Sequence, residues 1–277
     1  MKKCWLNNKI VVITGASGGL GFSISKLLIE KFNCKIIGIC RNEEKVKKSI
    51  ETLTKKENFT YKIFDVSVLE NWQNFYKFLE ENSIVPDVLI NNAGFMLPFT
   101  KIENVSIEEI EEIIKTNLTA YIYSTKILLP LIKKSSTPAI VNIASSAGLN
   151  AVIGQSMYCA TKFAVKGFTE TLIQDYKKQI YIGGVHPGFI KTDILNRQAI
   201  KDKESNLINK IMMPLDKATN KIVKSIKRKK KKTIMGIDGW FLGSFGRLFP
   251  NFTANTVRFV LKKSKLEMFD GVFKEDK

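Results

Sequence analysis

Residues Thr14–Gly21 read TGASGGLG and directly follow the apolar run Lys9–Thr14. The run predicts a buried β-strand, and the pattern at 20–31 predicts a helix. A glycine-rich turn between strand and helix lets the backbone approach an anion, and the helix N-terminus supplies unpaired N–H groups. The stretch therefore predicts a phosphate-binding loop, with a purely structural turn as the alternative. Its expected contacts are Gly15, Ala16, Ser17, Gly18, Gly19, Leu20 and Gly21.

Short apolar runs alternate with helical patterns along the chain. The expected strands are Lys9–Thr14, Cys34–Cys40, Phe59–Phe64, Val88–Asn91, Ala139–Ala144, Ile180–Val185 and Thr233–Ile237. The expected helices are 20–31, 42–55, 67–81, 106–133, 156–178 and 217–228. Strands apolar on both faces indicate a parallel sheet covered by helices on both sides. We therefore predict a doubly wound α/β sheet of about seven strands in one domain, 1–238, with an amphipathic extension, 239–277.

Composition narrows the class of protein. The chain has 277 residues, of which 44% are hydrophobic and 25% charged, so global disorder is excluded. Its four cysteines show no C-x-x-C spacing, and the single histidine, His186, cannot complete a zinc site with them. We expect no metal and no disulfide framework, and a reducing, cytoplasmic setting, since no apolar signal region precedes the first strand.

The residue after the second strand indicates which dinucleotide would bind. That strand ends at Cys40-Arg41-Asn42, where an NAD site usually places an acid against the ribose 2′-hydroxyl. Arg41 stands there instead, and a guanidinium pairs well with a 2′-phosphate. NADP(H) is therefore favoured over NAD(H). The alternative is that Arg41 merely faces solvent.

Further motifs follow in a fixed order after the glycine-rich turn. They are Asp65-Val66, NNAG at Asn91–Gly94, Asn117 in TNLTA, Ser145 in NIASSAG, YCATK with Tyr158 and Lys162, and HPGFIKT at His186–Thr192. With these motifs the chain resembles the short-chain dehydrogenase/reductase family over roughly Lys9 to Ile237. The resemblance implies a Rossmann fold and an oxidoreductase that interconverts a carbonyl and a secondary alcohol.

The resemblance also implies which residues form the site. The expected catalytic residues are Asn117, Ser145, Tyr158 and Lys162. Besides the loop, Arg41, Tyr158 and Lys162, the expected cofactor contacts are Asp65, Val66, Asn92, Ala93, Gly94, Pro187, Gly188, Ile190 and Thr192. Ser145 is preferred to Ser146 because it lies thirteen residues before Tyr158. A dinucleotide-binding sensor or a membrane-associated scaffold with little turnover is the alternative.

Carbonyl reduction needs these residue types. The nicotinamide supplies a hydride, so the protein must supply a proton and hold the geometry. Tyr158 would give the proton, and Lys162, one helical turn along, together with the oxidised nicotinamide would lower its pKa from about 10. Ser145 would donate a hydrogen bond to the carbonyl oxygen. By resemblance, Lys162 also holds the nicotinamide ribose and Asn117 helps position a water.

Three neighbouring features have simpler interpretations. His186 is interpreted as structural rather than catalytic. Cys159, beside Tyr158, is expected to be a small packing residue that points away from the site. The apolar residues between Ile194 and Pro214 either form a lid over a lipophilic substrate or simply cover the core.

Charge is concentrated late in the chain. Of the net charge of +18, residues 217–277 supply 16 Lys and Arg against 5 Asp and Glu, and they include KRKKKK at Lys227–Lys232. The segment Gly239–Lys263 is aromatic and basic, and its longest uncharged stretch, Leu248–Val257, is too short to span a bilayer. It is expected to lie on an anionic membrane surface, on its own domain or on a second subunit. A homo-oligomer is expected from the resemblance, and nucleic acid is unlikely because no reading motif accompanies the charge.

Overall fold

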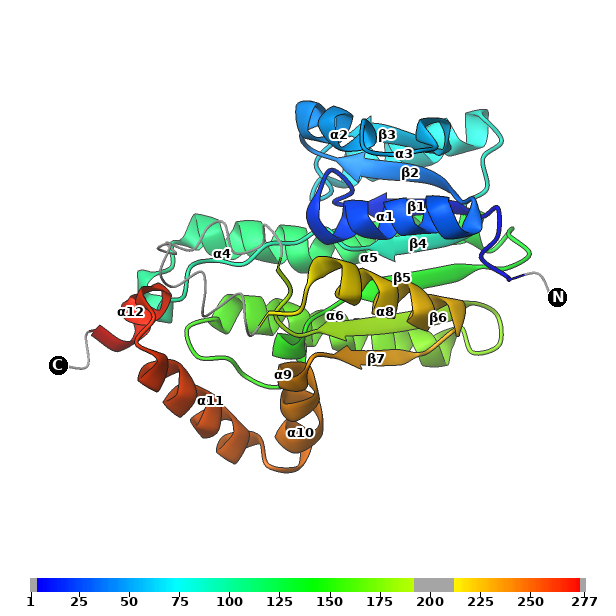
Figure 1. Cartoon of the computed structure of the whole chain (residues 1–277). Helices are drawn as coiled ribbons and strands as arrows, with labels where there is room; N and C mark the ends of the chain where they lie inside the picture. Colours follow the sequence, from blue (N-terminus) through cyan, green and yellow to red (C-terminus); the bar gives the residue numbers. More distant parts are fainter. Residues whose placement is uncertain (1–3, 192–211, 275–277) are drawn as a thin grey trace.

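A seven-stranded parallel sheet forms the centre of the molecule (Figure 1). The computed structural model describes residues 4–191 and 212–274. The strand order is β3-β2-β1-β4-β5-β6-β7. Successive strands are added on one side of β1 up to β3 and on its other side from β4 onward, so the switch point lies between β1 and β4. The strands are β1 (Ile10–Thr14), β2 (Lys35–Cys40), β3 (Phe59–Ile63), β4 (Val88–Asn91), β5 (Ala139–Ile143), β6 (Tyr181–Pro187) and β7 (Lys232–Met235). The predicted doubly wound sheet is confirmed, and its switch point is where such folds bind ligands.

Helices cover both faces of the sheet. The main ones are α1 (Gly19–Phe32), α2 (Glu43–Ile50), α3 (Leu69–Glu81), α4 (Ile107–Ile114), α5 (Ala120–Ile132), α6 (Ser156–Asp175) and α8 (Leu215–Lys227). Alternate strand residues enter opposite cores: Val11 and Ile13 pack with the α1 and α8 side, whereas Val12 packs with the α3 and α5 side. Strands buried on both faces explain why the sequence shows continuous apolar runs.

The expected helix at 106–133 is not continuous. Ser106 caps α4 in a capping box with Glu109, as the sequence indicates. A five-residue π-helical turn, η3 (Lys115–Thr119), then separates α4 from α5 and carries Asn117. The expected helix at 42–55 also ends earlier, at Ile50. Single wide turns inside helices are frequent at functional sites, and the hydrophobic period does not reveal them.

The C-terminal segment is helical and returns to the domain. It comprises α9 (Ile237–Trp240), the π-helical η6 (Phe241–Phe245), α10 (Gly246–Leu248), α11 (Pro250–Ser264), η7 (Glu267–Phe269) and α12 (Asp270–Phe273). Figure 1 shows α11 as an outlying helix between α10 and α12. The Phe269 ring meets Phe99 edge-on at 4.7 Å between centroids, and Val272 is buried in the same cluster.

The basic stretch Lys227–Lys232 precedes β7, whereas α9 follows the other end of that strand. The strand therefore separates these lysines from the aromatic segment that begins at α9. None of the described helices is long and apolar enough to cross a membrane.

Candidate active site

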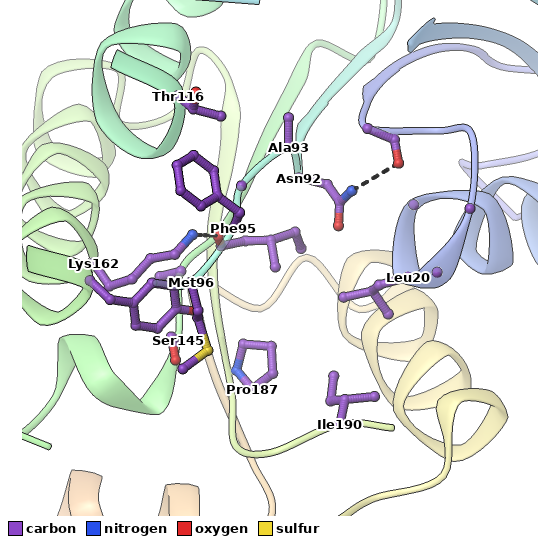
Figure 2. Close-up of a pocket in the computed structure, with 18 of the residues that line it drawn as sticks. Leu20, Asn92, Ala93, Phe95, Met96, Thr116, Ser145, Lys162, Pro187 and Ile190 are labelled. Atoms are coloured by element: carbon purple, nitrogen blue, oxygen red, sulfur yellow. Dashed lines mark hydrogen bonds between the residues drawn. The ribbon is translucent and has the colours of Figure 1, made fainter. Parts of the chain in front are cut away.

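A cavity of about 460 Å³ opens at the carboxyl ends of the strands. It extends from the glycine-rich loop, past Asn92–Gly94, to Ser145, Tyr158 and Lys162 (Figure 2). The elements that meet there are the β1–α1 turn, the ends of β2, β4 and β5, the first turns of α6 and the loop after β6. The topology therefore gathers motifs from widely separated parts of the chain around one cavity.

Two glycines of the loop occupy positions that would not accept a side chain. Gly15 has φ +67°, and a Cβ on Gly21 would lie 2.2 Å from the Gly15 carbonyl oxygen. Helix α1 begins at Gly19, with Gly18 at the N-cap, no capping side chain and no acid in the first turn. Its first N–H groups therefore face the cavity end of the helix, where a phosphate is favoured. The geometry fits a dinucleotide pyrophosphate.

Thr14 and Asn92 fasten the loop to the NNAG segment. The Thr14 hydroxyl accepts hydrogen bonds from the backbone N–H groups of Asn92 and Ala93, each at 2.9 Å. The Asn92 side-chain amide donates to the Thr14 carbonyl at 2.9 Å and to the Gly15 carbonyl at 3.4 Å. Because these hydrogen bonds satisfy the polar groups of both segments, the glycine-rich loop and the NNAG segment keep a fixed spacing along the cavity.

Two cations lie at the β2 end of the cavity. Arg41 lines it, as expected, and so does Lys45 in the first turn of α2. A Cβ on Gly18 would lie 2.7 Å from Lys45 Cε and 3.2 Å from its Nζ, so this side chain lies over the loop. Lys45 was missed by sequence reasoning. Its signal is a basic residue three positions after Asn42, the cap of the helix that follows β2.

Asp65, by contrast, does not line the cavity. Its carboxylate accepts a hydrogen bond from the backbone N–H of Ser67 at 2.8 Å. The neighbouring residues Phe64 and Val66 line the cavity, but Asp65 is not among the lining residues. Ala16 is also outside the lining because it is fully buried, and its Cβ faces Gly38.

Tyr158 and Lys162 lie one turn apart on α6, and both line the cavity with Ser145. The Lys162 Nζ lies 5.6 Å from the centre of the Tyr158 ring and donates a hydrogen bond to the Ile143 carbonyl at 3.2 Å (Figure 2). Tyr121, on α5, donates to the same carbonyl at 3.0 Å, and its ring centre lies 5.4 Å from Nζ. Tyr121 was not identified from the sequence, and it helps to place the lysine.

Burial governs the acid–base properties of these side chains. It raises the pKa of Tyr158 to about 12, against the lowering effect of a hydrogen bond with Ser145. It also lowers the pKa of Lys162 to about 8. In the chain by itself, desolvation favours the protonated form of Tyr158, and the expected lowering of its pKa by Lys162 together with the oxidised nicotinamide stays a prediction.

Asn117 serves the site through the backbone of Phe95. Its side-chain amide donates to the Phe95 carbonyl at 2.8 Å and its oxygen accepts from the Phe95 N–H at 2.9 Å. The Asn117 side chain is fully buried and does not line the cavity, whereas its neighbour Thr116 does. Water positioning by Asn117 therefore stays a prediction, and the observed contacts support the cavity wall.

His186 and Cys159 are both buried outside the cavity lining. The His186 Nδ1 lies 3.3 Å from the Ser145 carbonyl, and burial lowers the pKa of this histidine to about 4. Because a carbonyl only accepts, Nδ1 carries the proton. The Cys159 thiol contacts the backbone of Val152, and burial raises its pKa. Neither side chain is placed to exchange protons in the cavity.

The cavity lining that clusters with Tyr158 is mostly apolar. It comprises Phe95, Met96, Val152 and Phe189, with Gln155 as a polar member. Sequence reasoning did not assign these residues to the site, although Phe189 lies inside HPGFIKT and Phe95 directly follows NNAG. Behind this wall, Phe95 and Met96 belong to a buried cluster that includes Met268 and Phe269 of the C-terminal segment.

Within residues 4–191 and 212–274, no group of three or more His, Cys, Asp or Glu side chains is arranged to hold a metal ion. Thr192 and most of the expected substrate loop, including Ile194, Leu195, Leu207, Ile208 and Ile211, lie outside the described residues.

The motifs, their order and the cavity agree with a known family. The family model for short chain dehydrogenases matches residues 9–203. The chain belongs to the short-chain dehydrogenase family. Members of this family are oxidoreductases, and the relatives below include NADP-dependent ones.

Two relatives and one solved structure illustrate the similarity. A 3-oxoacyl-(acyl-carrier-protein) reductase of Chlamydia trachomatis is 37% identical over 198 residues, which cover 68% of this chain and 77% of the relative. An NADP-dependent 3-hydroxy acid dehydrogenase of Schizosaccharomyces pombe is 30% identical over 208 residues, covering 73% and 80%. A short-chain dehydrogenase from Streptomyces avermitilis shares the fold with a TM-score of 0.76 at 20% identity. The match covers 94% of the present chain and 100% of the Streptomyces chain.

Proposed function

We propose that this short-chain dehydrogenase is an NADP(H)-dependent oxidoreductase that interconverts a carbonyl and a secondary alcohol on a lipophilic substrate. The observation that carries the proposal is the convergence of Ser145, Tyr158 and Lys162 on the cavity that begins at the glycine-rich loop. When bound, the dinucleotide supplies or accepts the hydride. The protein's own side chains carry out all other steps.

Support for NADP(H) comes from the β2 end of the cavity. Arg41 and Lys45 line it, and the position directly after β2, where an acid would bind the ribose 2′-hydroxyl, holds Arg41 instead. Two cations beside the position of the ribose favour an additional phosphate through charge-assisted hydrogen bonds. The Schizosaccharomyces pombe relative is NADP-dependent by name.

In the reducing direction Tyr158 is the proton donor. It is protonated at neutral pH, since its pKa lies at about 12. Ser145 lies next to it, and its hydroxyl would stabilise negative charge that develops on the substrate oxygen. The Lys162 ammonium, inside the same cavity, stabilises the phenolate once the proton has left. The Ile143 carbonyl holds Lys162 and the Ala147 N–H holds the Ser145 hydroxyl, and these fixed positions reduce the entropic cost of reaching the reactive geometry.

The lining that clusters with Tyr158 supports a lipophilic substrate. Phe95, Met96, Val152 and Phe189 provide an apolar surface on which an acyl or alkyl chain can be buried. The two relatives are named for substrates with an oxygen at the third carbon, a 3-oxoacyl group and a 3-hydroxy acid. A 3-oxoacyl compound with an alkyl chain is therefore our first substrate class.

The test is NADPH oxidation with 3-oxoacyl esters of increasing chain length, together with small polar aldehydes and bulky cyclic ketones, and with NADH in parallel. We expect a kcat/KM that rises with chain length and a preference for NADPH. Tight NADPH binding without turnover of any carbonyl would instead favour a dinucleotide sensor.

A further inference from the structure

The C-terminal segment presents an unusual apolar surface to solvent. Among the described residues fourteen large apolar side chains are exposed, and seven of them lie between 240 and 260. We call them the aromatic face: Trp240, Phe245, Leu248, Phe249, Phe252, Phe259 and Val260. Their exposed fractions range from 40% to 73%. Isolated apolar side chains on a surface are ordinary, but a contiguous set marks an interaction site.

The aromatic face belongs to an ordered element rather than to a loose tail. Opposite it, Thr253 is fully buried, and Val257 and Leu261 pack against the cluster that contains Tyr158. Farther along, Phe269 and Val272 are buried in that cluster. The rings of Phe241, Phe245 and Phe249 also contact one another in sequence, at 5.7 and 5.9 Å. Helix α11 is thus fixed with Thr253, Val257 and Leu261 toward the domain and with Phe252 and Phe259 toward solvent.

Charge on the same segment has one sign. Residues 239–266 contain no Asp or Glu, and they carry five cations: Arg247, Arg258, Lys262, Lys263 and Lys265. The Lys263 ammonium lies 5.9 Å from the centre of the exposed Phe259 ring. Cations therefore flank the apolar side chains, as in helices that lie in a membrane interface with their charges at the headgroups.

We propose that residues 240–265 dock this protein peripherally on an anionic lipid bilayer. The aromatic face would enter the headgroup and acyl boundary, and the five cations would contact lipid phosphates. A second copy of the chain is the less suitable occupant, because two copies of this positive surface would repel each other. Since the buried side of the segment packs with Phe95 and Met96 of the cavity wall, docking would bring the apolar end of the cavity near the bilayer.

Vesicle binding tests the proposal without reference to turnover. The full-length protein is sedimented with phosphatidylcholine vesicles and with vesicles that contain equal amounts of phosphatidylcholine and phosphatidylglycerol, at low and high salt. We expect at least tenfold tighter binding to the anionic vesicles at low salt, reduced by high salt because screening weakens headgroup attraction. Equal binding to both vesicle types, or no binding, would overturn the proposal.

Trp240 provides a reporter within the aromatic face. It is 59% exposed, whereas Trp72 is fully buried. Anionic vesicles should shift the tryptophan emission to shorter wavelength, and Trp240→Phe should remove that shift. A shift that persists in Trp240→Phe would place the contact elsewhere and contradict the proposal.

Variants with matched controls locate the surface. Phe252→Ser with Phe259→Ser should weaken vesicle binding at least fivefold, whereas Ile107→Ser, which removes an equally exposed apolar side chain on α4, should not. The double variant Lys262→Gln with Lys263→Gln should also weaken vesicle binding at least fivefold. Its control, Lys230→Gln with Lys231→Gln in the turn before β7, should have a smaller effect. Thermal unfolding verifies that each variant is folded.

Two outcomes would replace the lipid surface with another partner. If the two phenylalanine substitutions leave vesicle binding unchanged but convert a dimer to a monomer in sedimentation velocity, the aromatic face is a contact between copies. If only the Lys230 and Lys231 substitutions reduce binding, the attraction is a general effect of the basic turn.

Discussion

Asn117 and Phe95 form a closed pair of hydrogen bonds that ties the π-helical turn to the loop after β4. The amide donates at 2.8 Å and the oxygen accepts at 2.9 Å. The arrangement occupies both polar groups of the Phe95 backbone, and Phe95 lines the cavity on its other side. The cavity wall at Phe95 is therefore built on a buried polar contact that comes from a helix interruption.

Asn117→Ala should lower both stability and turnover. The substitution leaves two buried backbone groups unpaired, which costs about 2–4 kcal/mol of unfolding free energy. Urea unfolding would measure it, with Asn82→Ala as control, because the Asn82 amide makes an exposed bond to the Phe78 carbonyl. A loss no larger than that of the control would contradict the assigned role.

Arg41→Ala should raise the KM for NADPH by about tenfold or more and leave the KM for NADH nearly unchanged. Loss of one charge-assisted hydrogen bond to a phosphate is worth about 1.5–3 kcal/mol. Lys45→Ala should act in the same direction, while Lys48→Ala, an exposed lysine on the same helix, should not. Steady-state kinetics with NADPH and with NADH measures these KM values for each variant. An unchanged NADPH preference in both Arg41→Ala and Lys45→Ala would refute the assignment of the cofactor.

The ionisation of Lys162 should appear in the pH profile of kcat/KM for NADPH, which reports the groups of the free enzyme. Lys162 is charged below its pKa of about 8 and neutral above it. We expect a plateau at lower pH and a fall above about 8, with Tyr158 still protonated because its pKa is about 12. Lys162→Gln should have lower activity and no break near pH 8. A break that survives the substitution belongs to another group.

His186 should make the protein sensitive to acid. Its pKa is lowered from 6.5 to about 4, so the unfolded chain binds a proton in this interval while the folded chain does not. Stability therefore falls as the pH drops from 6.5 towards 4, by about 3 kcal/mol from this residue alone. His186→Gln keeps a donor for the Ser145 carbonyl and should show a shallower decline. Parallel urea titrations at pH 7 and pH 5 test this, and identical declines would remove His186 as the cause.

The sequence predicted those parts of the fold that depend on local pattern. Strand Val88–Asn91 has the expected bounds, and the Ser106 capping box forms, because both depend on neighbouring residues. The π-helical turn at Lys115–Thr119 escaped prediction, since the hydrophobic period continues through it.

The site shows the same division. Ordered motifs placed Ser145, Tyr158 and Lys162 in one cavity, because each follows a strand or opens a helix at the same sheet edge. The position of Lys45 three residues after Asn42 is a local signal, but it does not show that the side chain lies over the glycine-rich loop. That placement and the pairing of Phe99 with Phe269 depend on how distant segments pack.

Substitution of Tyr158 by phenylalanine tests the central claim most directly. Phenylalanine keeps the ring that packs in the cavity and removes only the hydroxyl. NADPH binding, followed by fluorescence, should change less than threefold, while turnover of a carbonyl that the unaltered enzyme reduces should fall by about a thousandfold or more. Turnover within tenfold of the unaltered enzyme would show that another group donates the proton, and the assignment of Tyr158 would be wrong.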